Sequence, residues 1–200
     1  MVRPQEFNTA EVLDKALGLF LRKGFEATSM SDLLAATGLS RSSLYAAFGG
    51  KRDLFLAAFD AYRAERTAAL NRSLDSRPAR AAIEAFFRSI IDTAHGREPS
   101  CGCMSTNQAV ELAPHDAGIR ERIAADFQAI EDAFCRTIAR GQAEGSIAPA
   151  RDARAIARLL VVAFPGFQVM VRAGADPVRL DAALKELLTL LGEVPFRPAV

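Results

Sequence analysis

Apolar residues recur at helical spacing along almost the whole chain, and no segment alternates apolar and polar residues as a strand would. The first predicted helix starts after Asn8, a suitable N-cap, and stops at Gly24, which favours a left-handed C-terminal turn. The pattern predicts an all-α fold of about nine helices, with a loop at 96–100 and a frayed tail near 195–198. The predicted helices span 9–23, 30–37 after the capping residue Ser29, 41–48, 51–70, 78–95, 105–112, 116–144, 152–173 and 177–191.

Composition is that of a soluble globular protein, with 50% hydrophobic and 24% charged residues. The N-terminus lacks the apolar core of a signal peptide, and the longest apolar runs, such as 159–164, are too short to span a bilayer. Three cysteines, none in the first hundred residues, indicate no disulfide framework. We therefore expect a cytoplasmic protein with no membrane partner and no cofactor.

Charge is informative only locally, because the formal net charge of the chain is +1. Between Gly38 and Arg52 the charged residues are Arg41, Lys51 and Arg52, with no acidic residue among them. This cluster is a modest electrostatic footprint for a nucleic-acid partner.

Residues 29–48 have the spacing of a helix-turn-helix, with two short helices joined by a turn at Gly38. Leucines and Phe48 on the inner faces can pack the pair together. Arg41, Ser42, Ser43 and Tyr45 then face outward, and an arginine can form a bidentate contact with guanine in the major groove. The pattern predicts DNA binding.

Three segments carry a resemblance to a known family: Leu-Phe-Leu-Arg-Lys-Gly-Phe at 19–25, Ala-Thr-Ser-Met-Ser-Asp-Leu-Leu at 27–34, and Gly-Leu-Ser-Arg-Ser-Ser-Leu-Tyr-Ala-Ala-Phe-Gly-Gly-Lys-Arg-Asp-Leu-Phe at 38–55. This wording resembles the TetR family of bacterial transcriptional regulators. The resemblance implies a homodimeric regulator, usually a repressor, that binds an inverted-repeat operator in double-stranded DNA until an effector binds. It implies a helix-turn-helix domain at 1–52 and a helical effector-binding and dimerisation domain at 53–200.

Carried over position by position, the resemblance places Arg41, Ser42 and Tyr45 where the family reads bases or nearby phosphates. Thr28 and Ser29 fall at a helix N-terminus that meets the DNA backbone, and Lys51 falls where the family grips a phosphate. The chain departs from many relatives at 46 and 47, which are both alanine. Sequence specificity is therefore expected to depend mainly on Arg41.

The second half contains Cys101-Gly-Cys103-Met104 between two helices, near the mouth of the pocket that the family implies. Structural packing is the favoured interpretation, since buried cysteines usually behave as small hydrophobes. The alternative is a redox or electrophile sensor with Cys101 as the more exposed thiol. His95 and His115 flank the segment, but no zinc-binding spacing is present, so no metal is expected. The candidate pocket residues are Phe86, Cys101, Cys103, Met104, Gln108, Phe127, Phe134, Phe164, Phe167 and Gln168.

The resemblance also implies that the last two long helices form a four-helix interface between two copies. Pro165 is expected to kink the first of these helices and place part of it on the pocket. The residues expected to face the partner are Leu159, Leu160, Ala163, Leu184, Leu187, Leu188 and Leu191.

Two other classes of function compete with this interpretation. A helical enzyme is disfavoured because the chain has only two histidines, no Glu-x-x-His pair and no glycine-rich phosphate loop. A helical adaptor that binds only protein leaves the surface of Arg41, Tyr45 and Lys51 unexplained. A regulator released by a small apolar effector or by a thiol-reactive signal is the function that the sequence favours.

Overall fold

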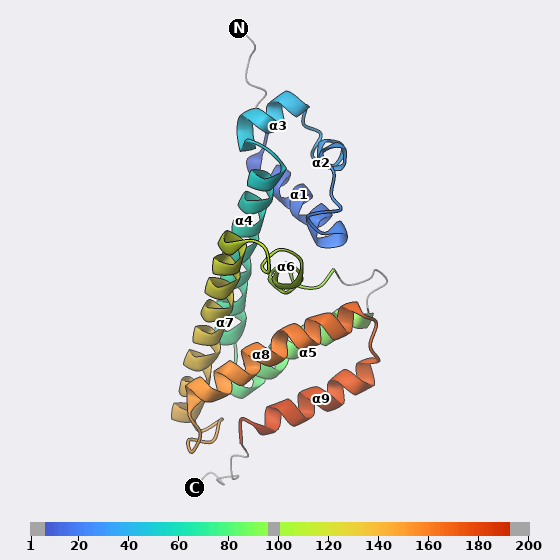
Figure 1. The fold of residues 1–200 in the computed structure, drawn as a ribbon. Coiled ribbons are helices and arrows are strands. Elements are labelled where there is room, and N and C mark those ends of the chain that lie inside the picture. The colour runs from blue at the N-terminus through green and yellow to red at the C-terminus, as the bar shows by residue number, and fades with distance from the viewer. Residues whose placement is uncertain (1–6, 96–100, 193–200) are drawn as a thin grey trace.

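The computed structural model describes residues 7–95 and 101–192, so the predicted loop at 96–100 and the predicted tail lie outside the described residues. The described residues form nine α-helices and one short 3-10 helix with no strand, which confirms the all-α prediction (Figure 1). The helices are α1 (Thr9–Lys23), α2 (Met30–Thr37), α3 (Arg41–Phe48), α4 (Lys51–Asp75), α5 (Ala79–Asp92), η1 (Thr93–His95), α6 (Met104–Glu111), α7 (Ala117–Glu144), α8 (Ala153–Arg172) and α9 (Pro177–Thr189).

Local capping explains the bounds of the first three helices. The Asn8 side chain accepts a hydrogen bond from the amide of Ala10 at 3.0 Å, and α1 ends at Gly24, whose φ of 82° suits glycine. Ser29 and Asp32 form a reciprocal capping box at the start of α2. Gly38, with φ 73°, turns the chain into α3, so these predicted bounds are confirmed.

Later bounds differ from the prediction where packing extends or shortens a helix. α4 continues to Asp75, beyond the predicted end at 70, because Leu70 and Leu74 are both buried against the body. α5 ends at Asp92, and the chain tightens into the 3-10 turn η1 before the undescribed residues.

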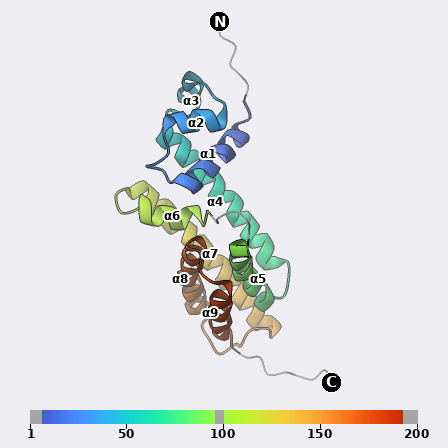
Figure 2. The same cartoon turned by 90° about the vertical axis from the view of Figure 1, so that its right-hand side faces the viewer.

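Two hydrophobic cores lie along α4. The upper core joins α1, α2, α3 and the first half of α4, and Met104, Leu112 and Ile119 extend it onto α6 and α7. The lower core fills the body between α5, α7, α8 and α9. α4 runs from one core to the other alongside α7 (Figures 1 and 2). It crosses the predicted boundary between residues 52 and 53 without a break, so the two units are joined by a helix.

α8 is an unusually apolar helix. By length and composition alone it could cross a membrane, so the expectation that no apolar segment is long enough was wrong. α8 nevertheless packs against α5 and α7 and buries Ile156, Leu160 and Phe164 in the lower core. Pro165 lies inside this helix, which runs unbroken from Ala153 to Arg172.

Candidate nucleic-acid interface and cavity

The outer face of α3 presents the residues expected to read DNA. Leu44 is fully buried and anchors the helix, while Arg41 and Ser42 are exposed and Tyr45 is 47% exposed. Arg41 and Tyr45 are four residues apart and therefore share one face of the helix. The half-buried Ser43 hydroxyl lies 2.8 Å from the hydroxyl of Ser40, the N-cap of the helix.

Thr28 and Ser29 lie just before α2 in different environments. Ser29 is exposed and caps α2, with its hydroxyl accepting from the amide of Asp32 at 3.1 Å. Thr28 is 1% exposed, and its hydroxyl donates to the carbonyl of Gly24 at 2.6 Å. The structure therefore gives Thr28 a role in ordering the loop between α1 and α2, where its hydroxyl is covered.

Lys51 lies at the N-terminus of α4, beside the same loop. Its ammonium donates to the carbonyl of Glu26 at 3.4 Å and lies 4.4 Å from the centroid of the Phe25 ring. Arg41, Ser29 and Lys51 thus come from three helix starts of one small unit. Their contacts with DNA stay a prediction.

The loop between α1 and α2 is also held from the opposite side by α6. The amide of Glu26 donates to Oε1 of Glu111 at 2.9 Å, and Gln108 donates to the other oxygen of that carboxylate at 2.9 Å. Gly24 makes this approach possible, because a Cβ there would lie 2.9 Å from Glu111 Oε1. One residue, Glu26, is therefore bound through its backbone N–H by α6 and through its backbone C=O by α4.

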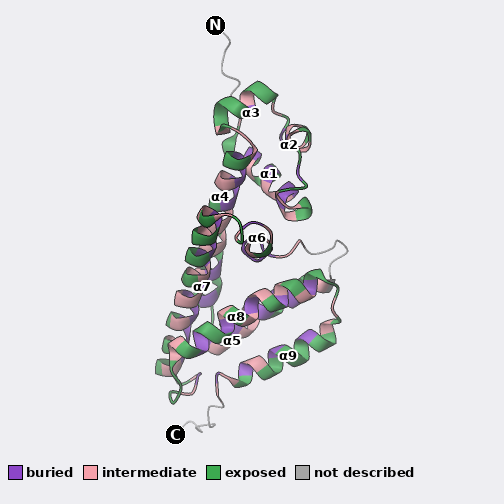
Figure 3. Cartoon of the chain, viewed as in Figure 1, coloured by how far each residue is buried: buried purple, intermediate pink, exposed green. Residues whose placement is uncertain are grey.

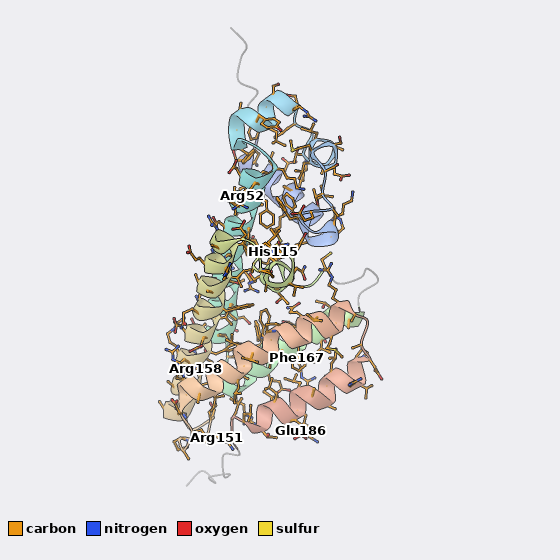
Figure 4. The ribbon with its side chains drawn as sticks, viewed as in Figure 1. Arg52, His115, Arg151, Arg158, Phe167 and Glu186 are labelled. Atoms are coloured by element: carbon orange, nitrogen blue, oxygen red, sulfur yellow. The ribbon has the colours of Figure 1, made fainter. Side chains whose placement is uncertain are left out.

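A second link joins the helix-turn-helix unit to α7. Arg52, labelled in Figure 4 near the start of α4, forms an ion pair with Asp116, the N-cap of α7. The Arg52 guanidinium lowers the pKa of Asp116 to about 2. Asp116 is therefore ionised at neutral pH and holds both Arg52 and the amide of Ile119.

A cavity of about 290 Å³ opens between α4, α5, α7 and α8. Three residues predicted for a pocket line it: Phe86, Phe164 and Gln168. Sequence reasoning missed Tyr62 and Arg66, which enter from α4. The remaining lining residues are Leu70, Ser89, Ile90, Thr93, Gly102 and Ile130.

Arg66 is the central polar residue of the cavity wall. Its Nη2 donates to Oδ2 of the buried Asp126 at 2.5 Å, and its Nη1 lies 2.7 Å from Sγ of Cys103. The hydroxyl of Tyr62 lies 3.6 Å from the same sulfur, and burial raises the pKa of that phenol far above its usual range. One signal could have revealed this site: Asp126 interrupts the apolar stripe of Ile123 and Ile130, which indicates a buried cationic partner.

The other predicted pocket residues lie outside the cavity wall. Cys103 is buried behind it, Met104 belongs to the upper core, and Gln108 is bound to Glu111. Phe134 and Phe167 are buried in the lower core, and the half-buried Phe127 packs against both cores. The half-buried Cys101 turns its carbonyl toward Asn107 and Arg172. No cluster of metal-binding side chains is present in residues 7–95 and 101–192.

The residues predicted to face a second copy divide into two groups. Leu160, Leu184, Leu188 and Leu191 are buried in the lower core of their own chain, and Ala163 and Leu187 are half-buried. Leu159 is 51% exposed, and its neighbours Val162 and Val169 are 75% and 50% exposed. The exposed side of α8, visible in Figure 3, therefore carries the large apolar residues Leu159, Val162 and Val169 beside the charged Arg158.

Comparison with known proteins matches both halves of the chain. The family model "Bacterial regulatory proteins, tetR family" matches residues 12–58, and "Tetracyclin repressor-like, C-terminal domain" matches 79–187. The chain is 32% identical over 193 residues to an uncharacterized HTH-type transcriptional regulator, YezE, of Bacillus subtilis, covering 96% of this chain and 100% of the relative. It is 30% identical to the HTH-type transcriptional repressor ComR of Escherichia coli, covering 89% and 86% of the two chains.

Solved structures agree with these relatives. A cysteine mutant of the TetR family transcriptional regulator CifR, complexed with 26-bp operator DNA, superposes with a TM-score of 0.81 at 27% identity. The superposition covers 93% of this chain and 98% of that one. A TetR transcriptional regulator from Chloroflexus aurantiacus superposes with a TM-score of 0.80 at 28% identity, covering 92% and 94%.

Proposed function

Because this chain belongs to the TetR family of DNA-binding transcriptional regulators, we propose that it is a repressor that releases its operator when a small molecule occupies the cavity. The observation that carries this proposal is that the cavity and the helix-turn-helix unit share α4. Tyr62, Arg66 and Leu70 of α4 line the cavity, and Lys51 begins the same helix. A ligand that binds better to one position of α4 changes the affinity for DNA at its other end.

α6 supplies a second connection between the cavity and the DNA-binding unit. The segment before α6 lies against the cavity through Gly102 and through the contact of Cys103 with Arg66. The last residue of α6, Glu111, holds the loop that precedes α2. A displacement of α6 therefore reaches the helix-turn-helix through a hydrogen bond as well as through α4.

We also propose that two copies pair through α8. The stripe of Leu159, Val162 and Val169 is an apolar surface on a long helix, a feature that marks protein contacts. A two-fold dimer presents two α3 helices, so its operator is an inverted repeat with half-sites separated by about one helical turn or a multiple of it.

A cytoplasmic location follows from this function. The relatives named above are transcriptional regulators, which gives the enzyme and adaptor alternatives no support.

The proposal is tested by footprinting purified protein on DNA flanking its own gene. We expect protection of an inverted repeat, two chains bound per site, and affinity that falls steeply with salt as phosphate contacts require. Binding that shows no sequence preference at physiological salt would exclude an operator-specific repressor.

A thiol-reactive signal is a second candidate trigger, because Arg66 Nη1 lies 2.7 Å from the Cys103 sulfur and a cationic neighbour is one setting in which cysteines are reactive. The variant Cys101→Ser/Cys103→Ser separates the two triggers. If thiols sense the signal, the variant no longer releases the operator after treatment with peroxide or an electrophile. If the cysteines only pack, it keeps its response to a reversible ligand. A response to oxidants that persists after Cys135 is also replaced would exclude thiol sensing.

A further inference from the structure

We propose that the ligand of the cavity is a small monocarboxylate with an apolar body, and that Arg66 binds its carboxylate. This inference rests on the proposed function, in which the cavity is the effector site. It names the class of ligand and the residue that selects it.

The described residues of the cavity wall carry one positive charge and no negative charge. Of the described residues that line it, Arg66 is the only one with a formal charge at neutral pH. Tyr62 stays neutral because burial raises the pKa of its phenol. A guanidinium that is only 21% exposed has lost most of its hydration, which makes an anionic partner favourable.

Among the described residues, the ion pairs behind Arg66 contain more positive than negative groups. The Asp126 carboxylate accepts hydrogen bonds from the guanidinium of Arg66 and from the hydroxyl of Ser105. Its other oxygen lies 4.0 Å from Nε of Arg63. Asp60 is in turn shared by Arg63 at 3.2 Å and by Arg122 at 3.1 Å. This connected cluster of described residues contains three guanidiniums and two carboxylates, so one positive charge remains. A ligand carboxylate would complete it.

Hydrogen-bond donors for that carboxylate are present on the wall. A guanidinium has five N–H groups, and the protein contacts of Arg66 engage one N–H each on Nη1 and Nη2. The amide of Gln168 has no hydrogen bond to any described residue. The hydroxyls of Ser89 and Thr93, by contrast, already donate to backbone carbonyls of their own turns.

The rest of the wall limits the body of the ligand. Leu70, Phe86, Ile90, Ile130 and Phe164 supply apolar surface. A volume of about 290 Å³ lies at the small end of ligand pockets, which suits a single ring or a short alkyl chain. A second charged group would meet no partner of opposite sign on the described wall, so dicarboxylates and nucleotides are excluded as good ligands.

The test compares probes that differ only in the charged group. Calorimetric titration of the full chain at neutral pH would use 3-phenylpropionate against 3-phenyl-1-propanol and octanoate against 1-octanol. We expect each carboxylate to bind at least about ten-fold more tightly than its alcohol, as a charge-assisted hydrogen bond requires. Arg66→Gln should remove this preference while the alcohols bind as before. Arg72→Gln, an exposed arginine of α4 outside both the cavity wall and the cluster, should keep it.

Further variants distinguish the loss of a ligand contact from a loss of folding. Since Arg66→Gln leaves the buried Asp126 without its cation, Arg66→Gln/Asp126→Asn is titrated alongside, and the thermal midpoint of each variant is recorded. Gln168→Leu should weaken the carboxylates more than the alcohols without disturbing the ion pair. Equal affinity of the wild type for both members of each pair, or no binding of either, would overturn the inference.

Operator release is recorded with the same probes, so that the two proposals fail separately. Release of the operator by the alcohols with no advantage for the carboxylates would overturn the assignment of Arg66 and keep the proposed function. A strong carboxylate preference with unchanged operator affinity would keep the assignment of Arg66 and overturn the role of the cavity in regulation.

Discussion

We expect recognition of the operator sequence to depend mainly on Arg41. The other residues on the outer face of α3 are serines, alanines and one tyrosine. Arg41→Ala should reduce operator affinity by about 1–3 kcal/mol and relax base preference at one position. Titrations on the operator and on substituted operators measure both effects. Arg72→Ala, an exposed arginine near the other end of α4, is the matched control and should change neither.

Lys51→Ala provides the contrast that separates base reading from phosphate binding. It should weaken all DNA sequences alike and flatten the slope of log affinity against log salt by about one. Unchanged affinity and preference in Arg41→Ala would show that another residue reads the operator.

At the scale of single residues, local chemistry was predictable and tertiary contacts were not. Asn8 and the Ser29–Asp32 pair cap helices through bonds spanning two or three residues, so the sequence shows them directly. The ion pair of Arg66 with Asp126 joins residues 60 positions apart, and on α4 alone Arg66 looks like a solvated charge. Gln108 was expected on the pocket because the sequence does not show its hydrogen-bond partner, which is Glu111.

At the scale of the helix, the exposed stripe of α8 decides the proposed pairing of two copies. Leu159→Glu/Val162→Glu should give monomers and abolish tight operator binding together, because each charge would be buried in a dimer. Light scattering coupled to size-exclusion chromatography measures the state. Val110→Glu, on the 77%-exposed Val110 of α6, is the control and should stay dimeric. A double variant that remains a dimer would place the interface elsewhere.

Helix periodicity predicted that α8 exists but not which side faces its own core. Arg154, Arg158 and Arg172 mark one side of α8, but residues 159–164 are all apolar, so the pattern does not separate Leu159 and Val162 from the residues that face the core. Leu160 is fully buried while Leu159 is half exposed, a distinction that depends on the packing of α5 and α7. The same limit explains why Leu184 and Leu188, apolar residues of α9, are buried within their own chain.

At the scale of the whole molecule, we expect a movement of α6 to reach the DNA-binding unit through the hydrogen bond between Glu111 and the amide of Glu26. Glu111→Ala removes the acceptor for the amide of Glu26. It should leave ligand affinity unchanged and reduce the ratio of operator affinities measured without and with ligand, which is the coupling between the sites. Glu121→Ala, an exposed acid on α7, is the control. If Glu111→Ala keeps the wild-type ratio of operator affinities without and with ligand, the coupling runs through α4 alone.

The ion pair of Arg52 with Asp116 makes the junction between the two units sensitive to acid. Its arginine lowers the pKa of Asp116 from 3.8 to about 2, so the stability that this carboxylate contributes is present above about pH 4 and is lost as the pH falls through 2. Thermal melting should therefore show Arg52→Ala below the wild type at pH 7, with the difference shrinking toward pH 2. A difference that does not depend on pH would mean that Arg52 acts through packing.

Because α4 is one unbroken helix, a small movement at the cavity becomes a larger movement at the DNA-binding unit. Leu70 at the cavity and Lys51 at the helix start are separated by about 28 Å, at a rise of 1.5 Å per residue. With such a lever arm, a tilt of about 6° at the cavity moves the far end by about 3 Å, close to the length of one hydrogen bond. In a two-fold dimer both arms swing, so the distance between the reading helices changes by up to about 6 Å against half-sites whose spacing DNA holds fixed.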